Sequence, residues 1–447
     1  MASLLQTLLQ EHHGRGQAVG LYSVCCSNEQ VLLAAMQVAQ RYETPLLIEA
    51  TSNQVDQFGG YTGMTPPQFR DYVLALAHRQ GFAAERLVLG GDHLGPNAWQ
   101  DLPAAEAMAH ARELIRSYVS AGFQKIHLDC SMACADDPQR LPDATVAQRS
   151  AELAEVSEAA AAAAGLPAPL YVIGTEVPIP GGEASLQDGV AVTRPEAARA
   201  TLAVHARAFE ATPALRAAWQ RVIALVVQPG VDFDHSQVQH YEPAAAAELS
   251  AFVEAQDLRP GLVFEAHSTD YQTEAALHAL VRDHFAILKV GPGATHALRE
   301  AWFALASIER ELLPAEQGSN LVEVLEHSML EQPRHWRKHY DGSPAQQRLA
   351  RRYAFSDRSR YYWGEPAVQQ ALQRLIANLD GIALPLPLIS QYLPEQVEDV
   401  LLGRLALCAT ALAQHKVGLV LARYARACSR NQAPQIESDS SAVLSYR

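Results

Sequence analysis

Short apolar segments rich in β-branched residues recur through the first 291 residues, and a helical stretch separates each from the next. We interpret eight of them as strands, at residues 18–26, 45–51, 86–93, 125–132, 170–177, 221–228, 261–268 and 285–291. Near-continuous apolar strands that alternate with helices indicate a parallel sheet covered on both faces. Eight such units predict the α/β fold class, as a closed (β/α)8 TIM barrel.

An open, doubly wound parallel sheet is the alternative to a barrel. That fold usually shows a glycine fingerprint directly after its first strand. Here residues 23–27 read Ser-Val-Cys-Cys-Ser, so the fingerprint is missing and the closed barrel is favoured.

Helical patterns dominate the rest of the chain. Residues 3–12 predict a short helix that closes the bottom of the barrel, and 298–313 predict an amphipathic helix outside the last strand. Further helices are expected at 321–330, 346–355, 367–379 and 397–421. We therefore expect a barrel at 1–313, a C-terminal helical extension at 314–430 that caps the barrel or mediates assembly, and a disordered polar tail at 431–447.

Composition narrows the class of protein. The formal net charge of -14 argues against a general nucleic-acid or membrane-surface binder, although a local arginine cluster would suffice for a phosphorylated substrate. The six cysteines form no C-x-x-C pair, and no segment approaches the roughly 20 apolar residues of a membrane span. The N-terminus lacks a signal-type pattern, so we expect a cytoplasmic protein with reduced thiols.

Polar side chains gather at one end of the predicted strands. Active sites of such barrels lie at the carboxyl ends of the strands, and the opposite ends show no comparable cluster here. This asymmetry indicates an enzyme-like site. The residues concerned are Ser23, Glu49, Ser52, Asn53, Asp92, His93, Asn97, Asp129, Ser131, Thr175, Glu176, Gln228, Asp232, Asp234, His235, Glu265, His267, Asp270 and Lys289.

Three histidines stand at the ends of predicted strands three, six and seven, namely His93, His235 and His267. Three imidazoles with an open position would suit Zn²⁺ or a similar divalent ion. Asp92, next to His93, is a candidate proton acceptor. The alternative is that each histidine makes an ordinary loop hydrogen bond and that Asp92 caps a turn. The long polar loop at 49–65 is a candidate lid or binding loop, or else a plain surface loop.

Several of these segments resemble a known family. They are IEATSNQVDQFGGYTGMTP at 48–66, GGDHLGPN at 90–97, KIHLD at 125–129, VIGTEV at 172–177, VQPGVDFDHS at 227–236, EAHSTDYQT at 265–273, HFAILKVGP at 284–292, SDR at 356–358, RYYW at 360–363 and ISQYLP at 389–394. The chain resembles, from about residue 10 to 425, the accessory subunit of class II D-tagatose-1,6-bisphosphate aldolase.

That family is similar in fold to the zinc-dependent class II aldolases. The resemblance implies Asp92 as acid/base and His93, His235 and His267 as ligands of a divalent metal, Zn²⁺ first, with Ni²⁺ or Mn²⁺ as options. Two departures stand out. Gly291 replaces an asparagine expected to hold the ketone, and Asp270 stands where a small residue would help to cradle a phosphate. A fixed negative charge at Asp270 would oppose a phosphate dianion.

Two functions of different class follow from the resemblance. One is an accessory subunit that stabilises a separate catalytic class II aldolase subunit. The other is a stand-alone metal-dependent 4-epimerase of a ketohexose such as fructose or tagatose.

Either reading implies a ketose or ketose phosphate as small-molecule ligand and a homo-oligomer. Asp92, Glu176 and Glu49 are the expected catalytic groups. Asn53, Asp129, Glu265, Asp270 and Lys289 are the expected substrate-binding residues. Whether Arg358 and Arg360 reach the site from the extension, or form salt bridges on a helix, stays open.

Overall fold

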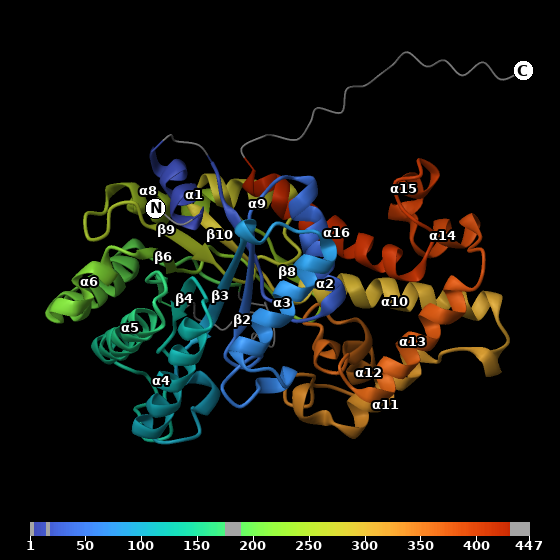
Figure 1. Ribbon diagram of the computed structural model, residues 1–447, viewed down its shortest axis with the longest axis horizontal. Helices are drawn as coiled ribbons and strands as arrows, with labels where there is room; N and C mark the ends of the chain where they lie inside the picture. Colours follow the sequence, from blue (N-terminus) through green and yellow to red (C-terminus); the bar gives the residue numbers. More distant parts are fainter. Residues whose placement is uncertain (1–3, 15–17, 175–188, 430–447) are drawn as a thin grey trace, which may run out of the picture.

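The computed structural model describes residues 4–14, 18–174 and 189–429, and its centre is a closed barrel of parallel strands (Figure 1). The strand order around the barrel is β1-β10-β9-β6-β5-β4-β3-β2, which confirms the predicted (β/α)8 fold. The barrel strands are β1 (Leu21–Val24), β2 (Leu46–Thr51), β3 (Leu87–Leu94), β4 (Lys125–Leu128), β5 (Leu170–Ile173), β6 (Val222–Val226), β9 (Val263–Ala266) and β10 (Phe285–Val290).

Each of these strands lies at one of the eight predicted segments, to within one residue at the end of β3. An additional small hairpin, β7 (Asp232–Phe233) with β8 (Val238–Gln239), follows β6 and was not predicted. The expected polar tail beyond residue 430 lies outside the described residues.

Helices surround the barrel and then continue past it. The first set is α1 (Leu4–Gly14), α2 (Glu29–Arg41), α3 (Pro66–Gln80), α4 (Ala104–Ser120), α5 (Asp143–Ala164), α6 (Pro195–Ala211), α7 (Arg216–Trp219), α8 (Pro243–Ala255), α9 (Glu274–Arg282) and α10 (Pro292–Leu312). The C-terminal set is α11 (Leu321–Glu331), α12 (Pro344–Tyr353), α13 (Pro366–Asp380), α14 (Leu386–Tyr392), α15 (Val397–Leu401) and α16 (Ala409–Cys428).

The helix predicted at 397–421 is two helices in the structure. α15 ends at Leu401, and Gly403 follows with φ 68°, a left-handed conformation that glycine adopts without strain. The backbone N–H groups of Arg404 and Leu405 then donate to the carbonyl of Asp399, so the chain turns before α16 begins.

The barrel interior is layered, because alternate residues of each strand point inwards. The lowest layer is apolar and includes Leu21, Leu47, Val88, Val263 and Ile287. Leu5 and Leu9 of α1 belong to the same cluster, so α1 closes the bottom as predicted. β4 gives this cluster no apolar side chain, since the buried Lys125 and His127 take its inward positions.

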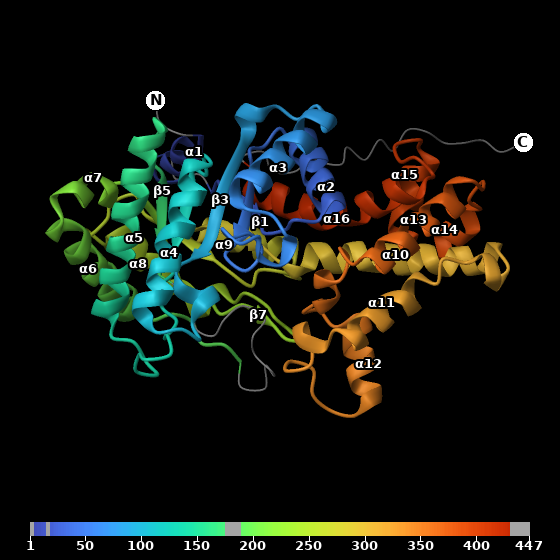
Figure 2. The same cartoon turned by 60° about the horizontal axis from the view of Figure 1, so that its bottom comes forward.

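The C-terminal helices pack against the outside of the barrel. α10 runs outwards from the end of β10, and α16 runs back and packs against α2, α9 and α10 (Figures 1 and 2). The amide of Gly20 donates to the carbonyl of Cys428 at 3.0 Å, and Tyr424 donates from its hydroxyl to the carbonyl of Thr269 at 2.7 Å. α16 therefore covers the outside of the barrel between its first and last strands.

Two further sequence expectations can be compared with the described residues. All six cysteines are free thiols. None of the helices in residues 4–14, 18–174 and 189–429 combines the length and apolarity that a membrane crossing needs.

Candidate active site

A charged layer lies above the apolar floor of the barrel. The ammonium group of Lys125 contacts Glu49 Oε1 at 2.6 Å and Glu265 Oε2 at 2.8 Å, and all three side chains are fully buried. Lys289 pairs with Glu49 and, at 2.8 Å, with Asp92 Oδ1. Although burial alone would lower the pKa of both lysines, these carboxylates raise it above the usual value. Both lysines are therefore cations at neutral pH and do not serve as nucleophiles.

Glycine at position 90 makes room for this layer. Gly90 lies opposite Glu49 in the β2–β3 pairing. A Cβ atom at Gly90 would lie 2.6 Å from Glu49 Oε1, closer than two such atoms can approach. Packing against Glu49 therefore explains why position 90 of β3 is a glycine.

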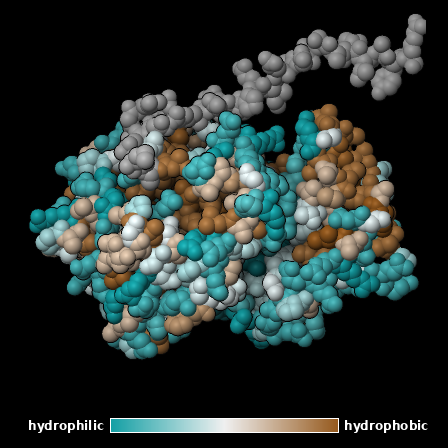
Figure 3. Space-filling model, viewed as in Figure 1, coloured by the Kyte–Doolittle hydropathy of each residue, from teal (hydrophilic) through white to brown (hydrophobic). Residues whose placement is uncertain are grey.

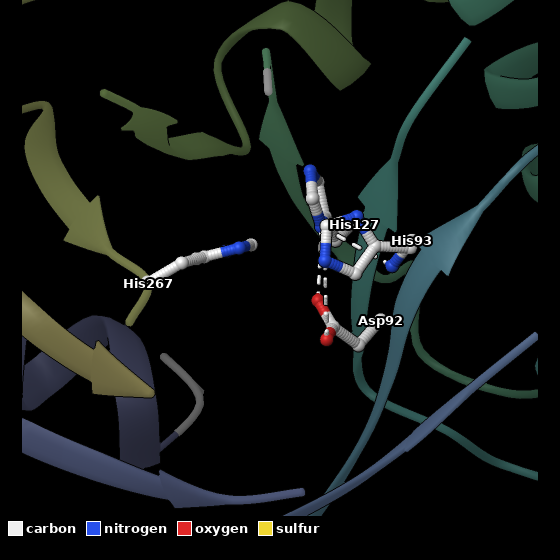
Figure 4. Close-up of side chains that lie close together, drawn as sticks. All are labelled: Asp92, His93, His127 and His267. Carbon is white, nitrogen blue, oxygen red and sulfur yellow. Dashed lines mark hydrogen bonds and ion pairs between the residues drawn. The ribbon is translucent and has the colours of Figure 1, made fainter. Parts of the chain in front are cut away.

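Three imidazoles converge above the charged layer (Figure 4). The ring centroids of His93 and His127 are 4.9 Å apart, those of His93 and His267 are 4.9 Å apart, and those of His127 and His267 are 5.5 Å apart. Each offers a nitrogen, and Asp92 a carboxylate oxygen, such that all four ligand atoms lie within 4.8 Å of one another. Nitrogen and oxygen donors in this arrangement are compatible with a divalent metal ion.

The end of β3 places His93 through an unusual backbone. His93 has φ 48°, and the β3–β4 register shifts between Gly91 and Leu94. Its Nδ1 donates to Asp129 Oδ2 at 2.8 Å, and Asn97 donates to the same oxygen at 3.0 Å. Nε2 therefore faces the cluster, 3.8 Å from Asp92 Oδ2. A carboxylate behind a ligating histidine is the usual way to orient it towards a metal.

The hydrogen bonds of His127 also favour a proton or a metal ion beside its Nδ1. Its Nε2–H donates to the carbonyl of Gly174 at 2.8 Å, which leaves Nδ1 with a lone pair in the neutral ring. That nitrogen accepts the backbone N–H of His93 at 3.2 Å and lies 3.0 Å from Asp92 Oδ1. A proton or a metal ion between Nδ1 and Asp92 would relieve the repulsion of two acceptors at this distance, and it would take the Nδ1 lone pair from the His93 N–H.

Burial and neighbouring charges shift the pKa values of the cluster members in different directions. Burial lowers the pKa of His267 to about 4, despite its 3.1 Å contact with Glu265. Burial would also lower the pKa of His93, but Asp92 and Asp129 raise it to about 9. Burial would raise the pKa of Asp92, yet His93 and Lys289 hold it well below its usual value. Asp92 is therefore an anion at neutral pH.

The cluster opens into a cavity of about 1010 Å³, which is lined by the barrel and by the C-terminal segment. The barrel contributes His93, His267 and Asp270. The C-terminal segment contributes Arg358 and Arg360, among other residues. The 3-10 helix η7 (Arg358–Tyr361) meets the candidate lid loop, because the rings of Tyr61 and Tyr361 lie 5.0 Å apart, edge to face. The C-terminal helices thus cap the barrel, one of the two roles expected for them.

Comparison with known proteins adds the family. The family model described as D-tagatose-1,6-bisphosphate aldolase subunit GatZ/KbaZ-like matches residues 5–429. The chain belongs to this GatZ/KbaZ-like family. The resemblance inferred from the sequence motifs is confirmed.

A solved structure shares the overall fold of this chain. A probable tagatose 6 phosphate kinase from Sinorhizobium meliloti 1021 is 48% identical, with a TM-score of 0.83 over 92% of this chain and 100% of its own. A fructose-bisphosphate aldolase from Campylobacter jejuni is 12% identical, with a TM-score of 0.44 over 84% of this chain and 92% of its own. The YdjI aldolase from Escherichia coli K12 is 9% identical, with a TM-score of 0.38 over 84% and 96%.

In this GatZ/KbaZ-like chain, His93 and His267 meet as the sequence predicted, but His235 does not join them. Its Nδ1 contacts Ser356 Oγ at 2.8 Å and its Nε2 donates to the carbonyl of His339 at 2.7 Å. The ring also lies edge-on to Tyr340 at 4.9 Å. The unpredicted β7–β8 hairpin carries His235 away from the strand ends, and the residue fastens the barrel to the C-terminal segment.

The third imidazole of the cluster is His127, which strand-end reasoning missed. The alternation Lys125, His127, Asp129 along one strand puts all three on the inner face of the barrel, and this was the available signal.

The remaining predicted site residues lie in different places. Glu49, Glu265 and Lys289 belong to the charged layer, and Asp129 orients His93. Asn53 lines the cavity on the candidate lid loop. Glu176 lies outside the described residues.

Asp270 holds the beginning of α10. Its carboxylate accepts the backbone N–H groups of Gly291, at 3.1 Å, and Gly293, at 2.9 Å. Burial raises the pKa of this carboxyl to about 6 despite these bonds. Two N–H groups that could otherwise bind an anion at the start of this helix are thus already paired within the protein.

Proposed function

We propose that this chain opens and re-forms the C3–C4 bond of a ketose or ketose phosphate, with inversion at C4, as a metal-dependent 4-epimerase. One observation carries the proposal: ligand atoms of three imidazoles and Asp92 lie within 4.8 Å of one another, and Asp92, His93 and His267 line the cavity. A purely structural subunit has no need for such a constellation of buried ionisable groups.

The proposed reaction is a retro-aldol step followed by its reverse. The C4 hydroxyl loses its proton, C4 becomes an aldehyde, the C3–C4 bond breaks, and its electron pair moves to the C2 carbonyl to give an enediolate. Re-addition to the other face of the aldehyde restores the bond with C4 inverted. Loss of the aldehyde instead would give aldolase products, as in the reaction that names the family.

His93, His127 and His267 are the proposed metal ligands, with Zn²⁺, Ni²⁺ or Mn²⁺ as candidates. A bound divalent ion would polarise the ketone and make the C4 hydroxyl more acidic. Asp92 is the proposed proton acceptor. Because His93 and Lys289 hold its pKa low, Asp92 is a weak base and depends on an acidified hydroxyl.

The cap favours epimerisation over release of the aldehyde. Residues of the C-terminal segment, such as Tyr361 and Trp363, line the same cavity as the histidines. A fragment produced beneath this cap is retained long enough to rotate and re-add. The cavity volume of about 1010 Å³ leaves room for a phosphorylated hexose and its rotation.

The experiment is an assay of the purified chain alone, with each of the three metals, on fructose, fructose 6-phosphate and tagatose 1,6-bisphosphate. Products are identified by NMR, with a trap for released aldehyde. We expect C4 epimers, and turnover that His267→Ala abolishes while His278→Ala, a partly exposed position on α9, leaves unchanged. Absence of turnover with every metal and sugar would contradict the proposal.

An accessory role is the second candidate, and a surface feature favours it. Leu401 (65% exposed) ends α15, Leu402 (57% exposed) follows it directly, and Leu407 lies in the next loop. An apolar area lies at the same end of the molecule in Figure 3. Exposed leucines so close together are typical of a protein contact. If the chain raises the activity of a catalytic tagatose-bisphosphate aldolase subunit yet binds no metal, this function replaces the first.

A further inference from the structure

Three arginines of the C-terminal segment line the cavity: Arg334 of the 3-10 helix η6 (Pro333–His335), and Arg358 and Arg360 of η7. Their guanidinium groups bond to neutral partners. Arg358 donates to the carbonyl of His335 at 3.0 Å, and Arg360 to the carbonyl of Asp357 and the hydroxyl of Tyr361. Arg334 contacts the His335 ring at 2.8 Å. Within the described residues, none of the three pairs with a carboxylate. We call them the arginine group.

The acidic side chains nearby do not neutralise the arginine group. The carboxylate of Asp357 accepts from Thr295 at 2.6 Å and Ser359 at 2.7 Å, and lies 3.3 Å from Arg299. Glu365 lines the same cavity but makes no ion pair with these arginines among the described residues. Unpaired cations that line a cavity are unusual in a chain whose net charge is -14.

Two further observations indicate that a negative charge beside the arginine group would be stabilised. The buried Nε of Arg358 has no hydrogen-bond partner. Burial lowers the pKa of His339 to about 4, and Arg358 adds to the effect. Burial likewise lowers the pKa of His335, with further contributions from all three members of the arginine group. An anion at this position would provide the missing acceptor and counter-charge together.

We propose that the arginine group binds the phosphate of a ketose 6-phosphate, with the sugar reaching from there to the histidine cluster. The identity of the sugar rests on the proposed function, whereas the anion site does not. Guanidinium groups suit phosphate because their N–H groups match its oxygens in pairs. The position of the phosphate at C6 fits Asp270, whose carboxylate already occupies the helix start beside His267 and opposes a second phosphate there.

Phosphate binding at this place would assist the proposed epimerisation. Cleavage of C3–C4 puts C4, C5, C6 and the 6-phosphate on the aldehyde fragment. The arginine group would hold that fragment by its phosphate while the aldehyde turns its other face to the enediolate. The phosphate ester bond stays intact throughout the reaction.

The test is calorimetric titration of the full chain, with EDTA present, using fructose 6-phosphate, fructose, fructuronate and inorganic phosphate as probes. We expect fructose 6-phosphate to bind at least about tenfold more tightly than fructose, since bonds between charged groups give factors of roughly 10 to 100. Arg358→Gln should weaken binding of fructose 6-phosphate about tenfold and leave fructose unaffected. Arg337→Gln, the loss of an exposed charge in the same segment, should change neither.

Controls separate this inference from the proposed function. His267→Ala should still bind fructose 6-phosphate, whether or not the wild type turns it over. Arg358→Lys keeps the charge and guards against misfolding of the glutamine variant, and it should show intermediate affinity. NMR should show the pKa of His339 rising when inorganic phosphate is added. Equal affinity for fructose and fructose 6-phosphate, tighter binding of fructuronate, or unchanged affinity in Arg358→Gln at wild-type melting temperature would each overturn it.

Discussion

Lys125 is the residue whose removal tests the charged layer most severely. Lys125→Met keeps a long side chain of similar shape but removes the ammonium group that contacts Glu49 at 2.6 Å and Glu265 at 2.8 Å. Loss of one partner from a fully buried ion pair costs about 3–5 kcal/mol, because the other charge stays buried. Glu49 keeps Lys289 and Glu265 keeps its 3.1 Å contact with His267, so we expect the lower end, about 3 kcal/mol.

Urea unfolding followed by circular dichroism measures this loss. The control is Lys416→Met, which removes a partly exposed ammonium paired with Glu395 and should cost less than about 1 kcal/mol. In the wild type, burial opposes ionisation of Glu265, but Lys125 and Lys289 keep its pKa low. That depressed pKa stabilises the fold above the usual glutamate value and is lost as pH falls. The curves of Lys125→Met and wild type should therefore stay apart from pH 8 to 5 and converge as pH falls below about 4.5. A loss below about 1 kcal/mol at pH 8, or a gap that widens with acid, would refute the account.

Three further predictions concern other sites. Burial lowers the pKa of His205 to about 4, so the folded state keeps it neutral and wild-type stability should fall as pH drops from about 6.5 to 4. His205→Leu should remove up to about 3 kcal/mol of that fall in pH-dependent urea melts, and an unchanged slope would contradict it. The pKa of Asp270 is raised to about 6, so its ionisation costs stability as pH rises from about 4 to 6. Asp270→Asn should abolish that loss and be about 2 kcal/mol more stable at pH 7, whereas parallel pH profiles would argue against it. Gly90→Ala should reduce stability by about 1–3 kcal/mol in the same melts, because its methyl group meets Glu49, and a neutral effect would show that the layer can relax.

The barrel could be predicted from the sequence because its strands are recognised from local patterns along the chain. Each strand is a short apolar run, and eight in succession with helices between allow few other folds. The position of α16 was not readable in this way. Nothing in residues 409–428 states that they return to pack against α2 and α9, since the order of helices along a chain does not fix which gap each one fills.

The candidate site was predictable in part. His93 and His267 adjoin clear strands, and the fold alone brings them together. His235 follows β6 by nine residues and lies in the turn of the β7–β8 hairpin, which carries it to Ser356, a contact between residues 121 positions apart. His127 lies inside a strand, where a histidine reads as core, and only the alternation with Lys125 and Asp129 reveals that it faces the barrel interior. Arg358 and Arg360 reach the cavity through tertiary folding of the C-terminal segment.

The metal content of purified variants is the sharpest test of the proposed metal site. Wild type, His93→Ala, His127→Ala, His267→Ala and His235→Ala are each loaded with Zn²⁺, desalted and measured by inductively coupled plasma mass spectrometry. We expect about one ion per chain in wild type and in His235→Ala, and marked loss in the other three variants. A metal-free wild type, or loss of the ion in His235→Ala with retention in His127→Ala, would contradict it.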